Sequence, residues 1–219
     1  MRLKTETKPV APHQDETRQQ LLEAAGEVFA DAGFRNATVR EICRRAGANI
    51  AAVNYHFGDK ERLYTEVLSY SHGKTVEKYP PLLGLSEDAP AEKKLRAFIF
   101  SLLLRIFDTG PNSWHGRLMA REMIEPSPAL DSLIEERIRP MSAQLFEIVA
   151  EILNRPGTDD CVRLCAFSVV SQCTFYKHCN PVMLRLYPKS EMDAAQIEST
   201  ADHITKFSLA ALKSFINKK

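Results

Sequence analysis

The sequence lacks long apolar runs and an excess of either charge. No stretch of about 18 consecutive apolar residues occurs, so no membrane-spanning helix is expected. The first residues also lack the apolar core of a signal peptide, which favours a cytoplasmic protein. Lysine and arginine number 29 against 28 aspartates and glutamates, for a formal net charge of +1. No overall positive field therefore draws the chain to nucleic acid, and any DNA contact must come from a local patch acting in two copies.

Cysteine is scarce and has no paired spacing. The five cysteines are an odd number, which suits a reducing compartment rather than a disulfide framework. Cys161 and Cys165 are one helical turn apart, and His178 and Cys179 follow downstream. One hypothesis is therefore a metal or thiol-redox sensor built on these four residues. The other is that they are buried structural thiols, which behave as small apolar groups.

Motifs of common enzymes are absent too. The sequence contains no nucleophile elbow, no glycine-rich phosphate loop and no zinc motif. His115 with Glu122 forms a loose pair that lacks a nucleophile. We therefore expect no catalytic site, no bound metal and no cofactor.

Strand patterns, internal repeats and low-complexity tracts are not found, and helical spacing dominates. The chain is predicted to be all-α, with about nine helices. Residues 1–14 are expected to form a disordered arm and residues 80–91 a linker. Two short helices are expected within residues 38–60, and the longer ones span about 15–32, 59–79, 91–109, 113–125, 127–154, 159–179 and 190–217.

Residues 38–57 have the pattern of two short helices joined by a tight turn. Thr38 can cap the first helix, with Glu41 completing a capping box. Gly47 supplies the left-handed turn, and Asn49 can cap the second helix. Three apolar positions of that second helix, at Ile50, Val53 and Phe57, are predicted to face inward. Small and polar residues on the other face suit a helix that enters the major groove of DNA.

These features resemble the helix-turn-helix of the TetR family of bacterial transcription regulators. The matching residues are Thr38, Ile42, Ala46, Gly47, Val53, Tyr55, His56, Phe57, Lys60, Leu63 and Tyr64, preceded by Leu21, Leu22, Ala24, Ala25, Phe29, Gly33 and Phe34. The resemblance implies a DNA-binding domain at residues 15–75 and a ligand-binding and dimerisation domain at residues 80–219. The C-terminal half is similar to the CecR/YbiH-like members, through Arg121-Glu122, Ser127-Pro128 and a bend at Pro140.

The DNA contacts are predicted from residue type and position. Asn49, Asn54 and Tyr55 are candidates for base or backbone contact, because asparagine can pair with adenine through a donor and an acceptor. Phosphate contacts are predicted for Thr38, Tyr55, His56 and Lys60, the last at a helix N-terminus that suits an anion. Arg44 and Arg45 either contribute or form a solvated face. The alternative for Tyr55 is packing of its ring inside the small domain.

A single domain of this kind reads few bases, so a homodimer on a palindromic operator is expected. The last two long helices are the predicted dimer surface. Four of their residues lie either in this surface or in the core of one chain: Val169, Cys173, Phe207 and Leu212. The resemblance implies control, as a repressor, by a small organic ligand in the helical bundle. Pocket candidates by residue type are Trp114, His115, Met119, Glu122, Met123, Phe146, Phe175 and Tyr176, each with core packing as the alternative. Arg121 and Glu122 are either polar anchors or a salt bridge, and the helix at 59–79 is the expected lever.

Overall fold

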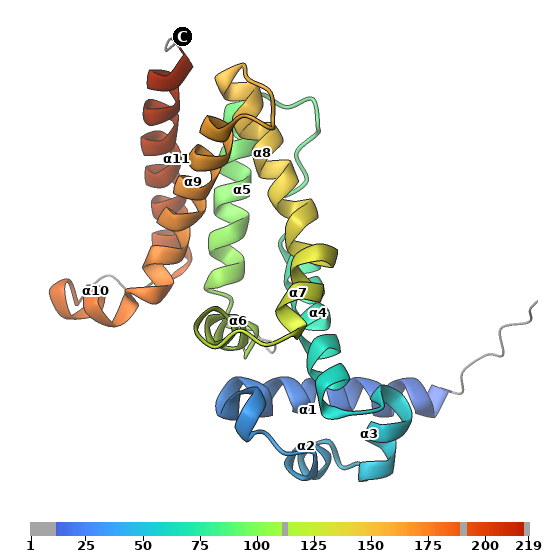
Figure 1. The fold of residues 1–219 in the computed structure, drawn as a ribbon. Helices are drawn as coiled ribbons and strands as arrows, with labels where there is room; N and C mark the ends of the chain where they lie inside the picture. Colours follow the sequence, from blue (N-terminus) through green and yellow to red (C-terminus); the bar gives the residue numbers. More distant parts are fainter. Residues whose placement is uncertain (1–11, 111–113, 189–191, 217–219) are drawn as a thin grey trace, which may run out of the picture.

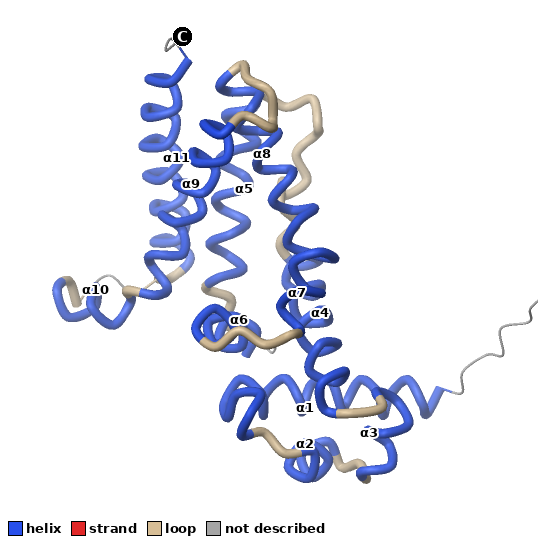
Figure 2. The backbone as a smooth tube through the Cα atoms, viewed as in Figure 1, coloured by secondary structure: helices blue, strands red, loops and turns tan. Residues whose placement is uncertain are grey.

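The computed structural model describes residues 12–110, 114–188 and 192–216. All regular structure in these ranges is helical: eleven α-helices and one π-helical turn, with loops between them (Figure 2). The all-α prediction is confirmed. Most of the expected arm lies outside the described residues, and its last three residues already belong to the first helix. None of the described helices combines the length and the apolar character that a membrane span requires.

Four helices make the N-terminal part of the molecule: α1 (Pro12–Asn36), α2 (Val39–Ala46), α3 (Ile50–Phe57) and α4 (Lys60–Lys78). The predicted stop of the first helix at Gly33 is a break inside α1, where φ of +76° departs from helical geometry. Helices α1 to α3 lie at one end of the molecule, and α4 leaves them toward the other domain (Figure 1).

The C-terminal part contains the remaining helices: α5 (Ala91–Ile106), α6 (Trp114–Ile124), α7 (Ala129–Leu133), the π turn η1 (Ile134–Ile138), α8 (Arg139–Leu153), α9 (Asp160–His178), α10 (Asn180–Leu186) and α11 (Ala194–Ile216). At the expected bend the helix widens into η1, which ends two residues before Pro140. Because proline has no N–H to donate within a helix, a wider π turn accommodates the missing bond. Helix α9 ends close to residue 179, as predicted, and the unpredicted α10 follows at once, with Pro181 in its first turn, where the missing N–H donor costs nothing.

Two hydrophobic cores hold the fold together. The first contains buried side chains of the four helices α1, α2, α3 and α4, together with four residues of α6 and α7: Trp114, Leu118, Ala129 and Leu133. The other is formed by the buried faces of α5, α8, α9 and α11. The segment α6–α7 thus belongs to the C-terminal part in sequence but packs on the DNA-binding helices. A shift of α6 or α4 must therefore change the packing in both domains.

Candidate nucleic-acid interface and effector cavity

The helix-turn-helix is fixed by its caps. The Thr38 hydroxyl accepts a hydrogen bond from the Glu41 backbone N–H at 3.2 Å, and Asn49 Oδ1 accepts one from the Ala52 N–H at 2.9 Å. Gly47 has φ of +65°, the left-handed conformation expected of the turn. The two predicted caps and the turn are therefore confirmed, and they set the angle at which α3 leaves α2.

The outer face of α3 carries the predicted reading residues. Tyr55 is 71% exposed, so the alternative that its ring packs inside the domain is wrong. Asn49 and Asn54 are exposed, and the half-buried His56 ring meets the Tyr55 ring edge-on, with 5.0 Å between centroids. Ile50 was predicted to face inward but is 49% exposed, because it lies in the first turn of α3, beyond the core.

Arg44 and Arg45 are held by a carboxylate within α2. Glu41 accepts hydrogen bonds from Arg44 at 2.8 and 2.7 Å and from Arg45 at 2.9 Å. The bonds to Arg44, and then those to Arg45, lower the pKa of Glu41 to about 2. The Glu41 side chain is therefore paired with arginines instead of closing the predicted capping box. Contact of either arginine with DNA stays a prediction and requires exchange of this carboxylate for phosphate.

Lys60 ties the start of α4 to the end of α1. Its ammonium donates to the carbonyls of Ala37 at 2.9 Å and Arg35 at 3.4 Å, and it lies 4.7 Å from the centroid of the Phe34 ring. An ammonium has three N–H donors, so one remains for a phosphate. Phosphate contacts by Lys60, Thr38 and His56 stay predictions.

Helix α6 docks on the DNA-binding domain through Trp114 and Arg121. The Trp114 ring lies against the backbone of Gly26, where a Cβ atom would overlap it. Arg121 donates to the carbonyls of Ala30 at 2.9 Å and Asp31 at 2.7 Å, near the end of α1. Trp114 was predicted to line the effector pocket, but its ring instead fills the contact between α6 and α1. Arg121 is neither a pocket anchor nor half of an internal salt bridge.

Glu122 connects α6 to α4. Its side chain is 1% exposed, and its Oε2 atom accepts a hydrogen bond from the Tyr64 hydroxyl. Its Oε1 atom accepts bonds from the Ser127 N–H at 2.7 Å and the Ser127 hydroxyl at 2.6 Å. Burial, and then the bond to Glu122, raises the pKa of Tyr64. Glu122 was predicted as a pocket residue, but these three donors occupy it as a clamp between the domains.

A cavity of about 240 Å³ lies beside this clamp. Helices α4, α5, α6 and α9 and the segment from η1 to α8 contribute to its wall. Three predicted pocket residues, His115, Met119 and Met123, line it. The full lining is His72, Thr75, Leu102, Arg105, Ile106, His115, Gly116, Met119, Ala120, Met123, Ile138, Met141, Thr174, Lys177 and His178.

The other aromatic candidates lie away from this cavity. Phe146 packs against Phe167, with ring centroids 6.1 Å apart, in the contact between α8 and α9. Phe175 and Tyr176 line a shallow surface depression beside α11, with His203 on its far side. None of these three predicted pocket residues is in the wall of the cavity beside the Glu122 clamp.

Arg105 is the main polar group of the cavity, and the sequence reading overlooked it. The side chain is only 6% exposed, its Nε donates to the Ser101 carbonyl at 3.3 Å, and one terminal nitrogen reaches the Met141 sulfur. The other terminal nitrogen is buried without a partner. Burial lowers the pKa of Arg105 to about 10, so the group stays charged at neutral pH. An arginine in the middle of the apolar run LLLRIF was the available signal.

Two histidines complete the polar wall. His115 Nδ1 lies 2.8 Å from the Ser71 hydroxyl, and His72 Nδ1 is buried without a partner. Burial lowers the pKa of His72 to about 4 and that of His115 to about 3, so both rings are neutral at pH 7. The cavity thus combines two neutral imidazoles with a guanidinium that is charged at neutral pH, and Lys177 and His178 also line it.

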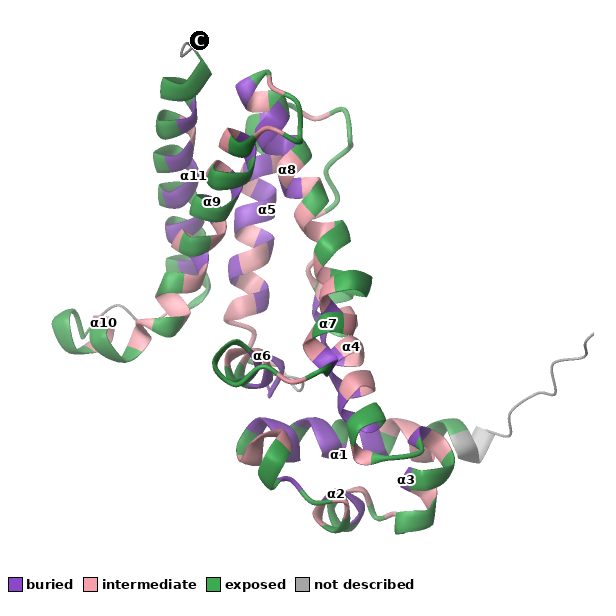
Figure 3. Ribbon diagram, viewed as in Figure 1, coloured by how far each residue is buried: buried purple, intermediate pink, exposed green. Residues whose placement is uncertain are grey.

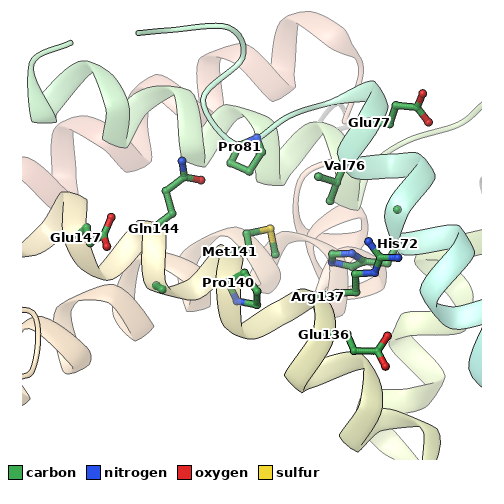
Figure 4. Close-up of a pocket in the computed structure, with 12 residues that line it drawn as sticks. His72, Val76, Glu77, Pro81, Glu136, Arg137, Pro140, Met141, Gln144 and Glu147 are labelled. Carbon is green, nitrogen blue, oxygen red and sulfur yellow. The ribbon is translucent and has the colours of Figure 1, made fainter. Parts of the chain in front are cut away.

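An open groove adjoins the cavity between α4 and α8. Its volume is about 670 Å³, and His72 and Met141 line both spaces. Figure 4 shows Glu77, Glu136 and Glu147 around this groove, with His72 and Arg137 close together at one end. The groove is therefore lined by carboxylates, whereas no acidic residue in the described part of the chain lines the cavity.

The proposed metal or redox group is not assembled. Cys161 lies in the first turn of α9 and His178 in its last, roughly 25 Å apart at about 1.5 Å per residue. Burial raises the pKa of Cys165 to about 11, which disfavours the thiolate that metals and oxidants require. Within the described residues no cluster of three or more His, Cys, Asp or Glu could hold a metal ion. One site using all four predicted residues is excluded by this geometry.

Helices α9 and α11 expose apolar side chains on their outer faces. Val169, Cys173 and Leu212 are buried in the core of one chain, whereas Phe207 is 60% exposed. Leu164 on α9 is exposed in the same way, and a groove of about 420 Å³ runs between the two helices. Figure 3 shows exposed residues along the outward sides of both helices. Of the four predicted dimer residues, Phe207 is exposed, Val169 and Leu212 lie in the wall of this groove, and Cys173 is buried away from it.

Comparison with known proteins agrees with this architecture. The model of bacterial regulatory proteins of the tetR family matches residues 21–67, and that of the C-terminal domain of the HTH-type transcriptional dual regulator CecR matches residues 91–212. CecR of Shigella flexneri is 31% identical over 62% of this chain, a match that spans 64% of CecR. The repressor NicS of Pseudomonas putida is 25% identical over 93% of this chain and 94% of its own.

Solved structures share the fold. A transcriptional regulator from a Rhodococcus species superposes with a TM-score of 0.66 at 20% identity, covering 89% of this chain and 96% of its own. The TetR-family regulator PfmR of Thermus thermophilus gives 0.62 at 21% identity, covering 88% and 95%. These relatives are transcription regulators and not enzymes. The chain therefore belongs to the TetR family of DNA-binding transcription regulators, with a C-terminal domain of the CecR type.

Proposed function

We propose that this protein is a ligand-responsive repressor that binds a palindromic operator as a homodimer and releases it when an organic molecule enters the cavity. One observation carries the proposal: α4 and α6, which form part of the cavity wall, are the helices that hold the DNA-binding domain. His115 on α6 contacts Ser71 on α4 within the cavity wall, and Glu122 contacts Tyr64 nearer the DNA-binding end of α4.

The coupling follows from this arrangement. A ligand that separates α6 from α4, or draws them together, shifts the base of α4, and α3 moves with it. Two copies of α3 must meet successive major grooves about 34 Å apart, so a small change in their separation weakens simultaneous docking. The ligand must have different affinities for the two arrangements, and its effect on DNA affinity is limited by that difference.

The dimer is proposed to form through the outer faces of α9 and α11. Exposed Leu164 and Phe207 flank a groove that can receive the partner's side chains, and two helices from each chain give a four-helix packing. This surface lies away from α3, so both reading helices remain free to contact DNA (Figure 1).

The test begins with an operator duplex selected from random sequence. By fluorescence anisotropy, Tyr55→Ala should weaken binding by roughly tenfold or more, the loss of one or two direct contacts. Phe207→Asp should reduce the mass by light scattering from twice 24.7 kDa to a monomer and abolish tight binding. Ile124→Ala, at another exposed position, serves as control. Full operator affinity in Tyr55→Ala, or from a monomer, would contradict the proposal.

A further inference from the structure

We propose that the cavity takes a small organic anion: a compact apolar body carrying one acid group, whose oxygen atoms pair with Arg105. The inference concerns the cavity of the proposed function and rests on it, but it adds the chemical class of the ligand. It starts from the guanidinium, which is buried, charged and incompletely bonded.

The chain supplies Arg105 with no anion among the described residues. Its two partners are a carbonyl oxygen and a thioether sulfur, and a sulfur is a weak acceptor. Asp108, three residues further along the chain, is bonded to Lys78 at 2.7 Å instead. A buried charge with no counter-ion is costly, and a hydrogen-bonded carboxylate is the group that offsets this cost best.

The rest of the wall favours the same ligand. Lys177 provides a second cation, and no described lining residue is acidic. Leu102, Ile106, Met119 and Ile138 provide apolar contacts for the body of the molecule. A few polar groups in a mostly apolar pocket fix the orientation of a ligand, which places the acid group at Arg105.

Other ligand classes fit less well. A cationic ligand would face two positive groups with no carboxylate to offset them. A neutral ligand could offer a carbonyl oxygen to the second terminal nitrogen of Arg105 but would leave the buried charge without a counter-ion. The neighbouring groove, with its three glutamates, has the opposite character, so the preference for anions belongs to the cavity alone.

The experiment uses three molecules with one body: 4-phenylbutyrate, 4-phenylbutanamide and 4-phenylbutylamine. Calorimetry on the full-length protein should show the acid binding roughly tenfold or more tightly than the amide, and no binding of the amine. Arg105→Met should remove the preference for the acid. It should still fold, because replacing an unpaired buried charge by an apolar residue of similar volume is seldom destabilising.

Two further variants keep the test independent of folding. Arg105→Lys retains the charge and should retain a preference for the acid. Arg137→Met, in the adjacent groove, should bind all three molecules as the unmodified protein does. The proposal is overturned if the acid does not bind, if the amide binds equally well, or if Arg105→Met keeps the preference.

Operator binding separates this inference from the proposed function. If the acid binds through Arg105 and operator affinity is unchanged, the anion site stands and the regulatory coupling falls. If acid and amide bind equally and both release the operator, the coupling stands and the anion inference falls.

Discussion

The bond between Tyr64 and Glu122 offers a sharp test of how the two domains are joined. Replacing Tyr64 by phenylalanine keeps the ring in the first hydrophobic core and removes only the hydroxyl that donates to Glu122. Because Glu122 is 1% exposed, water cannot easily replace the lost donor. One oxygen of a buried carboxyl group is then left without its partner.

The magnitude follows from the kind of bond. A hydrogen bond to a charged group contributes about 1.5–3 kcal/mol, against about 0.5–1.5 kcal/mol for a neutral pair. We expect Tyr64→Phe to lower the free energy of unfolding by about 2 kcal/mol, since the two bonds from Ser127 remain. For a chain of 219 residues this corresponds to a melting temperature lower by about 4–8 °C.

The assay is urea unfolding at one fixed protein concentration, because the proposed dimer would make stability concentration-dependent. Tyr70→Phe is the matched control on the same helix. The Tyr70 hydroxyl accepts from the Gln19 amide in a partly exposed position, so its loss should cost under about 1 kcal/mol. Equal and small losses in both variants would refute the argument that the Glu122 clamp holds α6 against α4.

Three further changes have defined outcomes. Gly26→Ala should destabilise the fold by about 1–3 kcal/mol in urea unfolding, because the new Cβ overlaps the Trp114 ring, although alanine normally gains about 1 kcal/mol in a helix. Burial holds the pKa values of His72 and His115 near 4 and 3, below the usual 6.5, so the unfolded chain binds more protons. The free energy of unfolding is therefore at its full value above about pH 6.5 and falls toward pH 4. At pH 5 the loss is at most about 2 kcal/mol per histidine. A variant with glutamine at both positions should lose less stability over this pH range. Glu41→Gln removes the carboxylate that holds Arg44 and one of the three carboxylates paired with Arg45, and should steepen the salt dependence of DNA affinity measured by anisotropy.

Local chemistry made the DNA-binding half predictable. Caps at Thr38 and Asn49 and the left-handed Gly47 are decided by neighbours within a few residues, so the sequence reveals them directly. The exposure of Ile50 was missed because helical spacing alone does not say where a helix extends past its core. The start of α10 was missed because Pro181 is compatible with both the end and the beginning of a helix.

The cavity could not be predicted in the same way. Residue type suggested Trp114 and Phe175 as readily as His115, because which face of a helix meets which neighbour is decided by packing between distant segments. Trp114 fills the space above Gly26, and that contact joins residues far apart in the sequence. At Arg105 a charged residue interrupts the apolar run at the end of α5, and this interruption was visible in the sequence.

The hydrogen-bond partners of Arg105 differ from those of the other cations described above. Arg44 and Arg45 are bonded to Glu41, Lys60 to backbone carbonyls and Arg121 to the end of α1. Each of these cations donates to carboxylate or carbonyl oxygens, whereas Arg105 leaves one terminal nitrogen without an acceptor inside a cavity. Stability alone would favour an apolar residue there, and departures from local consistency are expected at functional sites. The cavity that adjoins α4 and α6 therefore holds a binding group that the fold itself does not need.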